Sequence, residues 1–271
     1  MKRALFAAVT ASAFSIVACG GGGAPTVPSA PAPLPAADAC GALGVLGSMS
    51  GSSIAIYNGA ECTVERSPVV KLNMRSAINT AIGSCSGTII GPRAVLTAAH
   101  CLDEDVATVL VWLGEAGSPQ YVAESFVHYP GFAFGQSGLD VGVVFLSEDL
   151  PRTPVPILTS RPGVLGETAI IAGFGRSENS ETSKLRAGST TVAGVTATYL
   201  ESLYAPPSSS ICSGDSGGPI FLSQGGAWII AGISSATTGS ACNEGTNFYQ
   251  AVVNASVRDF IVQLVPAVGQ R

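Results

Sequence analysis

CSGDSGGP, residues 212–219, is the most informative run of this 271-residue sequence. Gly214 and Gly217 lie on either side of Ser216, in a segment with the composition of a tight turn. Such a turn lets backbone N–H groups converge on one point while the serine hydroxyl projects into a cleft. A lone Ser-Gly-Gly is usually a surface loop, but the eight-residue run is more specific. It therefore predicts a reactive serine beside an oxyanion hole.

A second segment supplies a histidine. LTAAHC, residues 96–101, places His100 after a predicted strand and among small residues, where its ring could face an open site. His100 is one of only two histidines in the sequence. A lone histidine is more often structural.

TAAHC, residues 97–101, and GDSGGP, residues 214–219, make the chain similar to the trypsin and chymotrypsin family of serine proteases. The resemblance implies a third member between them, an aspartate that opens an apolar strand, and GLDVGVVFL, residues 138–146, supplies it as Asp140. The order His, Asp, Ser is the order of this family. The resemblance extends from about Ile56 to the C-terminal helix, and it is looser at residues 128–131 and 173–175. It implies a serine endopeptidase that acts on proteins or peptides without a cofactor, as a monomer.

The resemblance also assigns roles to the residues of the three segments. It implies that His100 is the general base, that Asp140 orients it, and that Ser216 is the nucleophile. The backbone N–H groups of Gly214 and Ser216 are expected to form the oxyanion hole. Ser235 aligns with a serine that supports the aspartate in this family, although Ser234 is adjacent.

Short β-branched runs separated by turn residues predict an all-β domain with antiparallel strands, either a barrel or a sandwich. The predicted strands are residues 69–72, 87–90, 94–97, 108–113, 141–146, 168–172, 190–195, 219–222, 228–233 and 249–253. The family resemblance narrows this to two antiparallel six-stranded Greek-key β-barrels with a C-terminal α-helix. Apolar residues at helical spacing from Val257 to Val265 agree with that helix, and either Asn254 or Ser256 is its predicted N-cap.

Composition excludes several classes of protein. Charged residues make up 11% of the chain and apolar residues 46%, which does not suit a disordered protein. The net charge is -5 and no basic run occurs, so nothing indicates a nucleic-acid partner. Two separated histidines, and cysteines assigned to bridges, provide no cluster of metal ligands. We therefore expect no metal site.

The N-terminus resembles a bacterial lipoprotein signal. Two basic residues precede an apolar stretch, residues 4–18, that ends directly before Cys19. This predicts a signal peptide at residues 1–18 and lipidation of Cys19, with Gly20 favouring the outer membrane. The alternative is an ordinary secretory leader in which Cys19 is incidental. Either reading exports the protein, to the periplasm, the membrane or the medium. Residues 19–39, rich in Gly, Pro and Ala, are the predicted tether.

Seven cysteines leave one unpaired in an exported protein, and lipidation of Cys19 accounts for it. Among the other six, the family resemblance implies the pairs Cys85–Cys101 and Cys212–Cys242. The remaining pair is Cys40–Cys62.

The segment that starts at Ile56 stands where the family's mature enzymes begin. Ile56-Tyr57-Asn58-Gly59 departs from the family's Ile-Val-Gly-Gly-like start at two of the four positions. One hypothesis is cleavage between Ala55 and Ile56, which makes residues 40–55 a propeptide and 56–271 the protease domain. The new ammonium of Ile56 would then pair with Asp215. The alternative is activity of the uncleaved chain, with another cation or hydrogen bond ordering Asp215.

The resemblance also locates the substrate pocket. Ser210, followed by Ile211, stands where trypsin-like enzymes have the aspartate that binds Lys or Arg, so a basic preference is not expected. Thr237 and Asn247 align with the pocket walls, where they would narrow the entrance. Together with Ser235 they predict a pocket for small apolar residues, as in elastase-like relatives.

Two other function classes stay open at this point. One is a catalytically silent protease homologue that serves as a binding module on the cell surface, which a fluorophosphonate probe would not label. The other is an esterase with the same three side chains, although the serine lacks the Gly-x-Ser-x-Gly strand-turn-helix context of those folds.

Overall fold

The computed structural model describes residues 36–44, 47–48, 56–103, 105–114, 118–133, 138–176 and 184–271. The predicted signal peptide, Cys19, residues 19–35 of the predicted tether and most of residues 45–55 lie outside this part of the chain. The described strands are β1 Gly47–Ser48, β2 Ala60–Cys62, β3 Val69–Arg75, β4 Ala81–Gly91, β5 Ala94–Thr97, β6 Thr108–Trp112, β7 Gln120–His128, β8 Gly142–Leu146, β9 Thr168–Gly173, β10 Arg186–Val195, β11 Tyr199–Leu203, β12 Pro219–Gln224, β13 Ala227–Thr237 and β14 Thr246–Ala251. The described helices are α1 Ala36–Ala42, the 3-10 helix η1 Ala99–Leu102 and α2 Ala255–Leu264.

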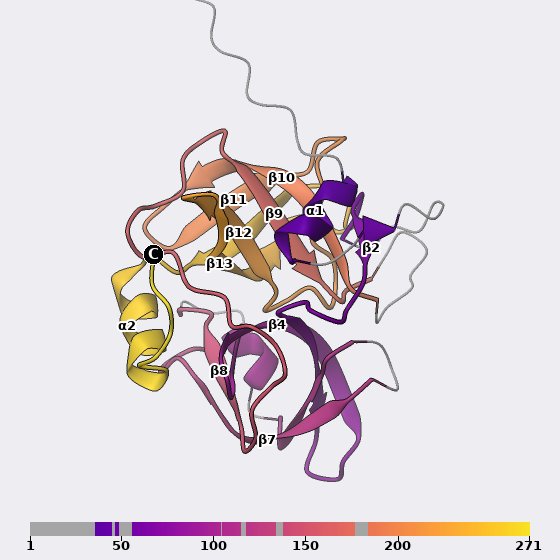
Figure 1. The fold of residues 1–271 in the computed structure, drawn as a ribbon, viewed down its shortest axis with the longest axis vertical. Coiled ribbons are helices and arrows are strands. Elements are labelled where there is room, and N and C mark those ends of the chain that lie inside the picture. Colours follow the sequence, from indigo (N-terminus) through magenta and orange to yellow (C-terminus); the bar gives the residue numbers. More distant parts are fainter. Residues whose placement is uncertain are drawn as a thin grey trace, which may run out of the picture.

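Strands β3 to β8 close into an antiparallel barrel in the order β3-β4-β5-β8-β7-β6. It forms the lower half of the molecule in Figure 1. β4 and β5 are buried along most of their length, which suits their apolar runs, residues 87–91 and 94–97. His100 and Asp140 both follow or precede strands of this first barrel.

Strands β9 to β14 form a second antiparallel barrel, in the order β9-β10-β11-β14-β13-β12, which closes because β12 also pairs with β9. The two barrels therefore share one strand order. The predicted fold of two six-stranded barrels with a C-terminal helix is confirmed. The segment that carries Ser216 enters β12 of this second barrel.

The C-terminal helix α2 joins the two barrels. It follows β14 of the second barrel but packs against the first, where the ring of Phe260 meets Tyr129 edge-on at 5.4 Å. Val265, which caps its C-terminus, lies against Gly91 of β4. Asn254 is the N-cap: its side chain accepts hydrogen bonds from the N–H groups of Ser256 and Val257. Of the two predicted caps, the structure selects Asn254.

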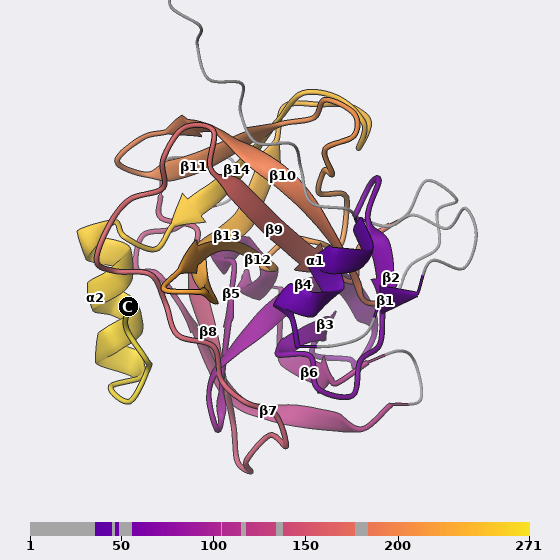
Figure 2. The same ribbon diagram turned by 45° about the horizontal axis from the view of Figure 1, so that its top comes forward.

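Residues 36–39, at the end of the predicted tether, belong to helix α1. Ala39 and Cys40 are fully buried, because the helix is tied to β2 by the Cys40–Cys62 disulfide and packs beside β10 (Figure 2). No helix in the described part of the chain is both long and apolar enough to cross a membrane.

Candidate active site

His100 lies in η1, directly after β5. The disulfide between Cys101 and Cys85 fixes this short helix to β4 of the same barrel. The His100 side chain is 15% exposed, so the ring is held at a surface that a ligand can reach. The two small residues before it, Ala98 and Ala99, are fully buried.

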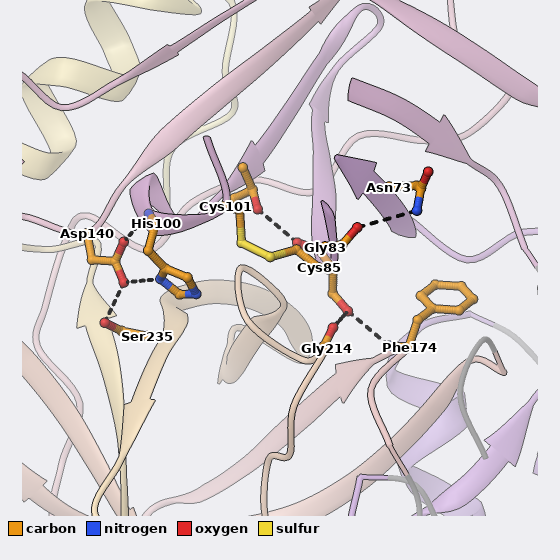
Figure 3. Close-up of a disulfide and its surroundings, with 11 residues drawn as sticks. Asn73, Gly83, Cys85, His100, Cys101, Asp140, Phe174, Gly214 and Ser235 are labelled. Carbon is orange, nitrogen blue, oxygen red and sulfur yellow. Dashed lines mark hydrogen bonds and ion pairs between the residues drawn. A yellow bond between two sulfur atoms is a disulfide. The ribbon is translucent and has the colours of Figure 1, made fainter. Parts of the chain in front are cut away.

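Asp140 contacts the Nδ1 edge of the His100 ring, as Figure 3 shows. Its Oδ2 lies 2.8 Å from Nδ1 of His100, and its Oδ1 accepts the backbone N–H of His100 at 3.0 Å. Ser235 donates its hydroxyl to Oδ2 at 2.6 Å. An ionised carboxylate can only accept hydrogen bonds, so it favours the tautomer with the proton on Nδ1. The opposite nitrogen, Nε2, then carries a lone pair that can take a proton.

The surroundings of Asp140 set its ionisation state. Burial acts to raise the pKa of Asp140, but the hydrogen bond and charge of His100, together with the hydroxyl of Ser235, outweigh burial and lower the pKa below its usual value. Asp140 therefore stays ionised, as the tautomer argument requires.

The segment from Cys212 to Gly218 forms a tight loop in which each carbonyl from residue 213 to residue 216 accepts a hydrogen bond. The donors are, in order, Arg176 N–H at 2.9 Å, Ser86 Oγ at 2.9 Å, Gly218 N–H at 2.9 Å and Ser86 N–H at 2.8 Å. In a trans peptide the N–H points opposite to the C=O. The carbonyls of Ser213 and Asp215 are turned toward their donors, Arg176 and Gly218, so the N–H groups of Gly214 and Ser216 point the opposite way.

Neither of these two N–H groups has an acceptor among the residues that the structure describes. Gly214 has φ +97°, a conformation that a side chain would strain, and Gly217 has φ +78°. The glycines therefore permit the backbone path that leaves two donors side by side. This arrangement can bind an oxyanion.

The loop lies against the segment that carries His100. A Cβ atom placed on Gly217 would come within 2.0 Å of Thr97 Oγ1 and 2.9 Å of Ala98 N. Gly217 N–H also donates to Ser234 O at 2.8 Å, directly before the serine that contacts Asp140. The structure therefore brings the loop with Ser216 to the same junction of the two barrels as His100 and Asp140.

Asp215 points away from this surface and is fully buried. Its two oxygens accept the N–H groups of Gly175 at 2.8 Å and of Cys212 at 2.9 Å. Burial raises the pKa of Asp215 to about 7, although these two hydrogen bonds and the charge of Arg186 oppose the shift. Ile56 is also buried, but no hydrogen bond joins it to Asp215 in the described part of the chain; its carbonyl accepts Gly59 N–H.

The predicted pocket residues fall into two environments. Ser210 and Asn247 are buried and joined by a hydrogen bond of 3.1 Å from Ser210 Oγ to Asn247 Oδ1. Asn247 Nδ2 in turn donates to the hydroxyl of Ser202. Thr237 pairs with Asn247 across β13 and β14 but is exposed, and Ile211 packs in the core of the second barrel.

The three predicted disulfides are present: Cys40–Cys62, Cys85–Cys101 and Cys212–Cys242. In the described residues, Cys85, Cys101 and His100 are the one group of three potential metal ligands. Both sulfurs are in a disulfide and offer no thiolate, so this group does not suit a metal ion.

Sequence reasoning missed two polar residues that contact the site. Ser86 holds the loop, as described above, and Gln250 accepts the backbone N–H of Asp140 at 2.9 Å through its side-chain oxygen. Both are fully buried. Nothing in the local sequence marks either residue, because the groups they bind are far away along the chain.

The chain is similar to several known proteins. A family model described as Trypsin matches residues 56–261. A chymotrypsin from Phaedon cochleariae is 29% identical over 195 residues, which cover 63% of this chain and 70% of that protein. A trypsin from Simulium vittatum is 26% identical over 196 residues, covering 61% of this chain and 79% of the relative. Among solved structures, HL collagenase has the same fold, with a TM-score of 0.62 at 22% identity over 73% of this chain and 93% of its own.

Proposed function

The chain belongs to the trypsin family of serine proteases, and from this premise we propose that it cleaves peptide bonds through an acyl-enzyme on Ser216, with His100 as general base and Asp140 as its partner. The observation that carries the proposal is the chain of hydrogen bonds from Ser235 through Asp140 to His100 Nδ1. It supports a histidine whose Nε2 can accept the serine proton.

The proposed reaction follows from these positions. Nε2 of His100 takes the hydroxyl proton as Ser216 Oγ attacks the scissile carbonyl, and Asp140 stabilises the imidazolium that forms. The N–H groups of Gly214 and Ser216 bind the oxyanion, each contributing about 3 kcal/mol to transition-state stabilisation. His100 then returns the proton to the leaving amine, and water releases the acyl group by the same route in reverse.

We further propose a preference for small apolar residues on the acyl side of the cleaved bond. Two features of the pocket support it. The base carries Ser210 and no carboxylate to compensate a buried cation, and the side chain of Asn247 reaches across to the Ser210 hydroxyl. A cavity shortened in this way suits Ala or Val better than Arg, Lys or Phe.

The test is hydrolysis of a panel of chromogenic peptides by the purified full-length chain and by Ser216→Ala. Turnover after Ala or Val that is lost in the variant is the expected result. Cleavage after Arg or Lys instead would contradict the pocket assignment but not the proposed protease activity. No turnover and no fluorophosphonate labelling would favour the silent binding module, and turnover of esters alone would favour an esterase.

For activation, we propose cleavage between Ala55 and Ile56, after which the Ile56 ammonium pairs with Asp215. The Cys40–Cys62 disulfide would keep residues 40–55 attached to the protease domain, 56–271. N-terminal sequencing of the active species tests this, because the active chain must begin at Ile56.

One observation favours the alternative, activity of the intact chain. Arg186 is fully buried, and its charge opposes the rise that burial causes in the pKa of Asp215. Arg186 pairs with Gly173 across β9 and β10, and the Cβ direction of Gly173 points at Asp215 Oδ1. Since paired residues project to the same face of a sheet, Arg186 extends on the face that Asp215 occupies. Full activity in a chain with an intact 55–56 bond would select this alternative.

For location, we propose an exported protein anchored to the outer membrane by a lipid on Cys19, after removal of residues 1–18 and with residues 19–39 as the spacer. The three disulfides support export to an oxidising compartment. We expect the protease in the membrane fraction, and Cys19→Ser in the soluble fraction. Equal distribution of the two proteins would favour an ordinary secretory leader.

A further inference from the structure

We propose that Ser86 is a positioning residue for the oxyanion hole, a role that rests on the proposed function of the loop from Cys212 to Gly218. Ser86 belongs to β4 of the first barrel, whereas the loop belongs to the second. In this proposal the serine does not touch the substrate; it holds the peptide groups whose N–H donors do.

Ser86 makes three hydrogen bonds that meet at the loop. Its backbone N–H donates to Ser216 O at 2.8 Å, and its hydroxyl donates to Gly214 O at 2.9 Å. The same hydroxyl accepts the N–H of Phe174 at 2.9 Å. Both partners of the hydroxyl, Gly214 and Phe174, are labelled in Figure 3. Ser86 thus fixes two of the four hydrogen-bonded carbonyls of the loop and connects them to Phe174, directly after β9.

The tied carbonyls flank the donors of the proposed oxyanion hole. Gly214 O belongs to the peptide that follows the Gly214 N–H, and Ser216 O belongs to the peptide that follows the Ser216 N–H. Fixing these peptides restricts rotation about φ and ψ of both residues. The restriction matters most at Gly214, which has no Cβ to limit its conformations and holds φ +97°.

The serine hydroxyl is suited to this position because it can donate and accept at once. Ser86 is fully buried, and the backbones of Gly173 and Gly218 lie directly against its side chain. Removing the hydroxyl leaves the Phe174 N–H and the Gly214 carbonyl without partners in a site that has little room for water. The Gly214 peptide can then turn to find another donor, which misdirects the N–H groups of the hole.

The experiment compares the full-length chain with Ser86→Ala in steady-state hydrolysis and in binding of a peptide aldehyde. The aldehyde forms a hemiacetal with Ser216, and its oxygen occupies the oxyanion hole, whereas the same peptide with a hydrogen atom in place of the aldehyde group fills the pocket without that oxygen. We expect Ser86→Ala to lower kcat about 10- to 100-fold, somewhat less than loss of a donor itself. Aldehyde affinity should fall by a similar factor, while KM and the affinity of the peptide without the aldehyde group change less than about 3-fold.

Two further variants separate positioning from a general loss of stability. Ser67 is also buried, and its hydroxyl bonds only to the backbone of Val69 among the described residues, so Ser67→Ala removes a comparable hydroxyl away from the loop. We expect it to keep kcat and aldehyde affinity. Ser86→Thr retains a hydroxyl and is expected to recover most of the loss of Ser86→Ala.

Three results would overturn the proposal. The first is that Ser86→Ala has wild-type kcat and aldehyde affinity while Ser216→Ala is inactive. This result would overturn the role of Ser86 and leave the proposed protease function unaffected. The second is a loss of activity equal to the loss of folded protein, with unchanged kcat per titrated active site. The third is a wild-type chain that neither turns over peptides nor reacts with a fluorophosphonate, which overturns the proposed function as well.

Discussion

Asp140 and Asp215 are both buried carboxyl groups, but the protein shifts their pKa values in opposite directions. Burial acts to raise both pKa values. Asp140 receives side-chain hydrogen bonds from His100 and Ser235 and the charge of His100, and its pKa is lowered. Asp215 receives two backbone N–H groups and the charge of Arg186, and its pKa is raised to about 7. The partners of Asp140 outweigh the effect of burial, whereas burial outweighs the partners of Asp215.

Ser235 is one of these partners, and its removal should be measurable in catalysis. Ser235→Ala removes the 2.6 Å hydrogen bond to Asp140 Oδ2, so Asp140 holds the histidine less firmly and its pKa rises. We expect kcat/KM to fall about 10-fold, on the order of one charge-assisted hydrogen bond. Ser234→Ala is the matched control, because the Ser234 hydroxyl is buried and has no partner among the described residues. Equal kcat/KM in wild type and Ser235→Ala would contradict the prediction.

Because Gly173 has no side chain, the carboxylate of Asp215 can lie directly against its backbone. A Cβ atom on Gly173 would lie 2.2 Å from Asp215 Oδ1, and two N–H groups hold that carboxylate in place. We therefore expect Gly173→Ala to reduce the free energy of unfolding by about 2 kcal/mol and to lower kcat as the loop shifts. Denaturant unfolding and peptide hydrolysis measure the two effects.

The control for Gly173 is Gly41→Ala, because nothing lies within 4 Å of a Cβ at Gly41. Its stability should stay within about 0.5 kcal/mol of wild type. A Gly173→Ala protein as stable and active as Gly41→Ala would show that Asp215 can move without consequence.

At the level of elements, substitutions in α2 show whether this helix stabilises the fold without affecting the active site. Asn254→Ala removes the side-chain cap from two N–H groups and should lower the free energy of unfolding by about 1 kcal/mol. We expect kcat/KM to stay unchanged, because no bond of Asn254 reaches the site residues. Ser256→Ala, at the other predicted cap, should have almost no effect. Denaturant curves for the three proteins distinguish the two residues.

The strands predicted from the sequence are those with continuous or regularly alternating apolar residues. Each of the ten predicted runs overlaps a strand of the structure, and the run 94–97 matches β5. Strand β7, Gln120–His128, was missed. Tyr121, Ala123 and Phe126 of this strand pack against the core. A β-bulge between Ala123 and Ser125 changes which residues face inward, so the period of two that marks a strand is interrupted. β11 was missed as well, and helix α1 lies partly in a segment whose composition indicated a tether.

At the scale of the whole molecule, the site exists only where the two barrels meet. The first barrel supplies His100 and Asp140, and the second supplies Ser235 and the loop with Ser216. Contacts cross the junction in both directions: Ser86 of the first barrel binds the loop, and Gln250 of the second binds the backbone of Asp140. Unfolding of either barrel should therefore abolish activity.

The buried Asp215 predicts a pH dependence of the stability of the whole fold. Its pKa is raised in the folded protein from 3.8 to about 7, so folding favours the protonated form. The stability that this group contributes is fully present below pH of about 4 and is lost as the pH rises through about 7. Asp215→Asn cannot titrate and serves as the reference. We expect the free energy of unfolding of the wild type, minus that of the variant, to decrease from a pH of about 4 to a pH of about 7 and then to level off.

Urea unfolding of both proteins at several pH values, with the disulfides intact, measures this difference. A difference that grows with pH would contradict the prediction. It would mean that the ionised form of Asp215 is the stable one, with Arg186 as a sufficient counterion.

The sequence alone determined the family of this protein and most of its strands, because both depend on short segments. The residues of TAAHC, GLD and GDSGGP, and the apolar runs, are readable within ten positions of each other. The tertiary structure decided which residues serve those segments. Ser235 rather than Ser234 faces Asp140 because the register of β13 shifts between Ser234 and Ala236. Ser86, Gln250 and Arg186 likewise act on groups far along the chain. Strand register sets the face on which each side chain lies, and register is fixed by the packing of whole barrels.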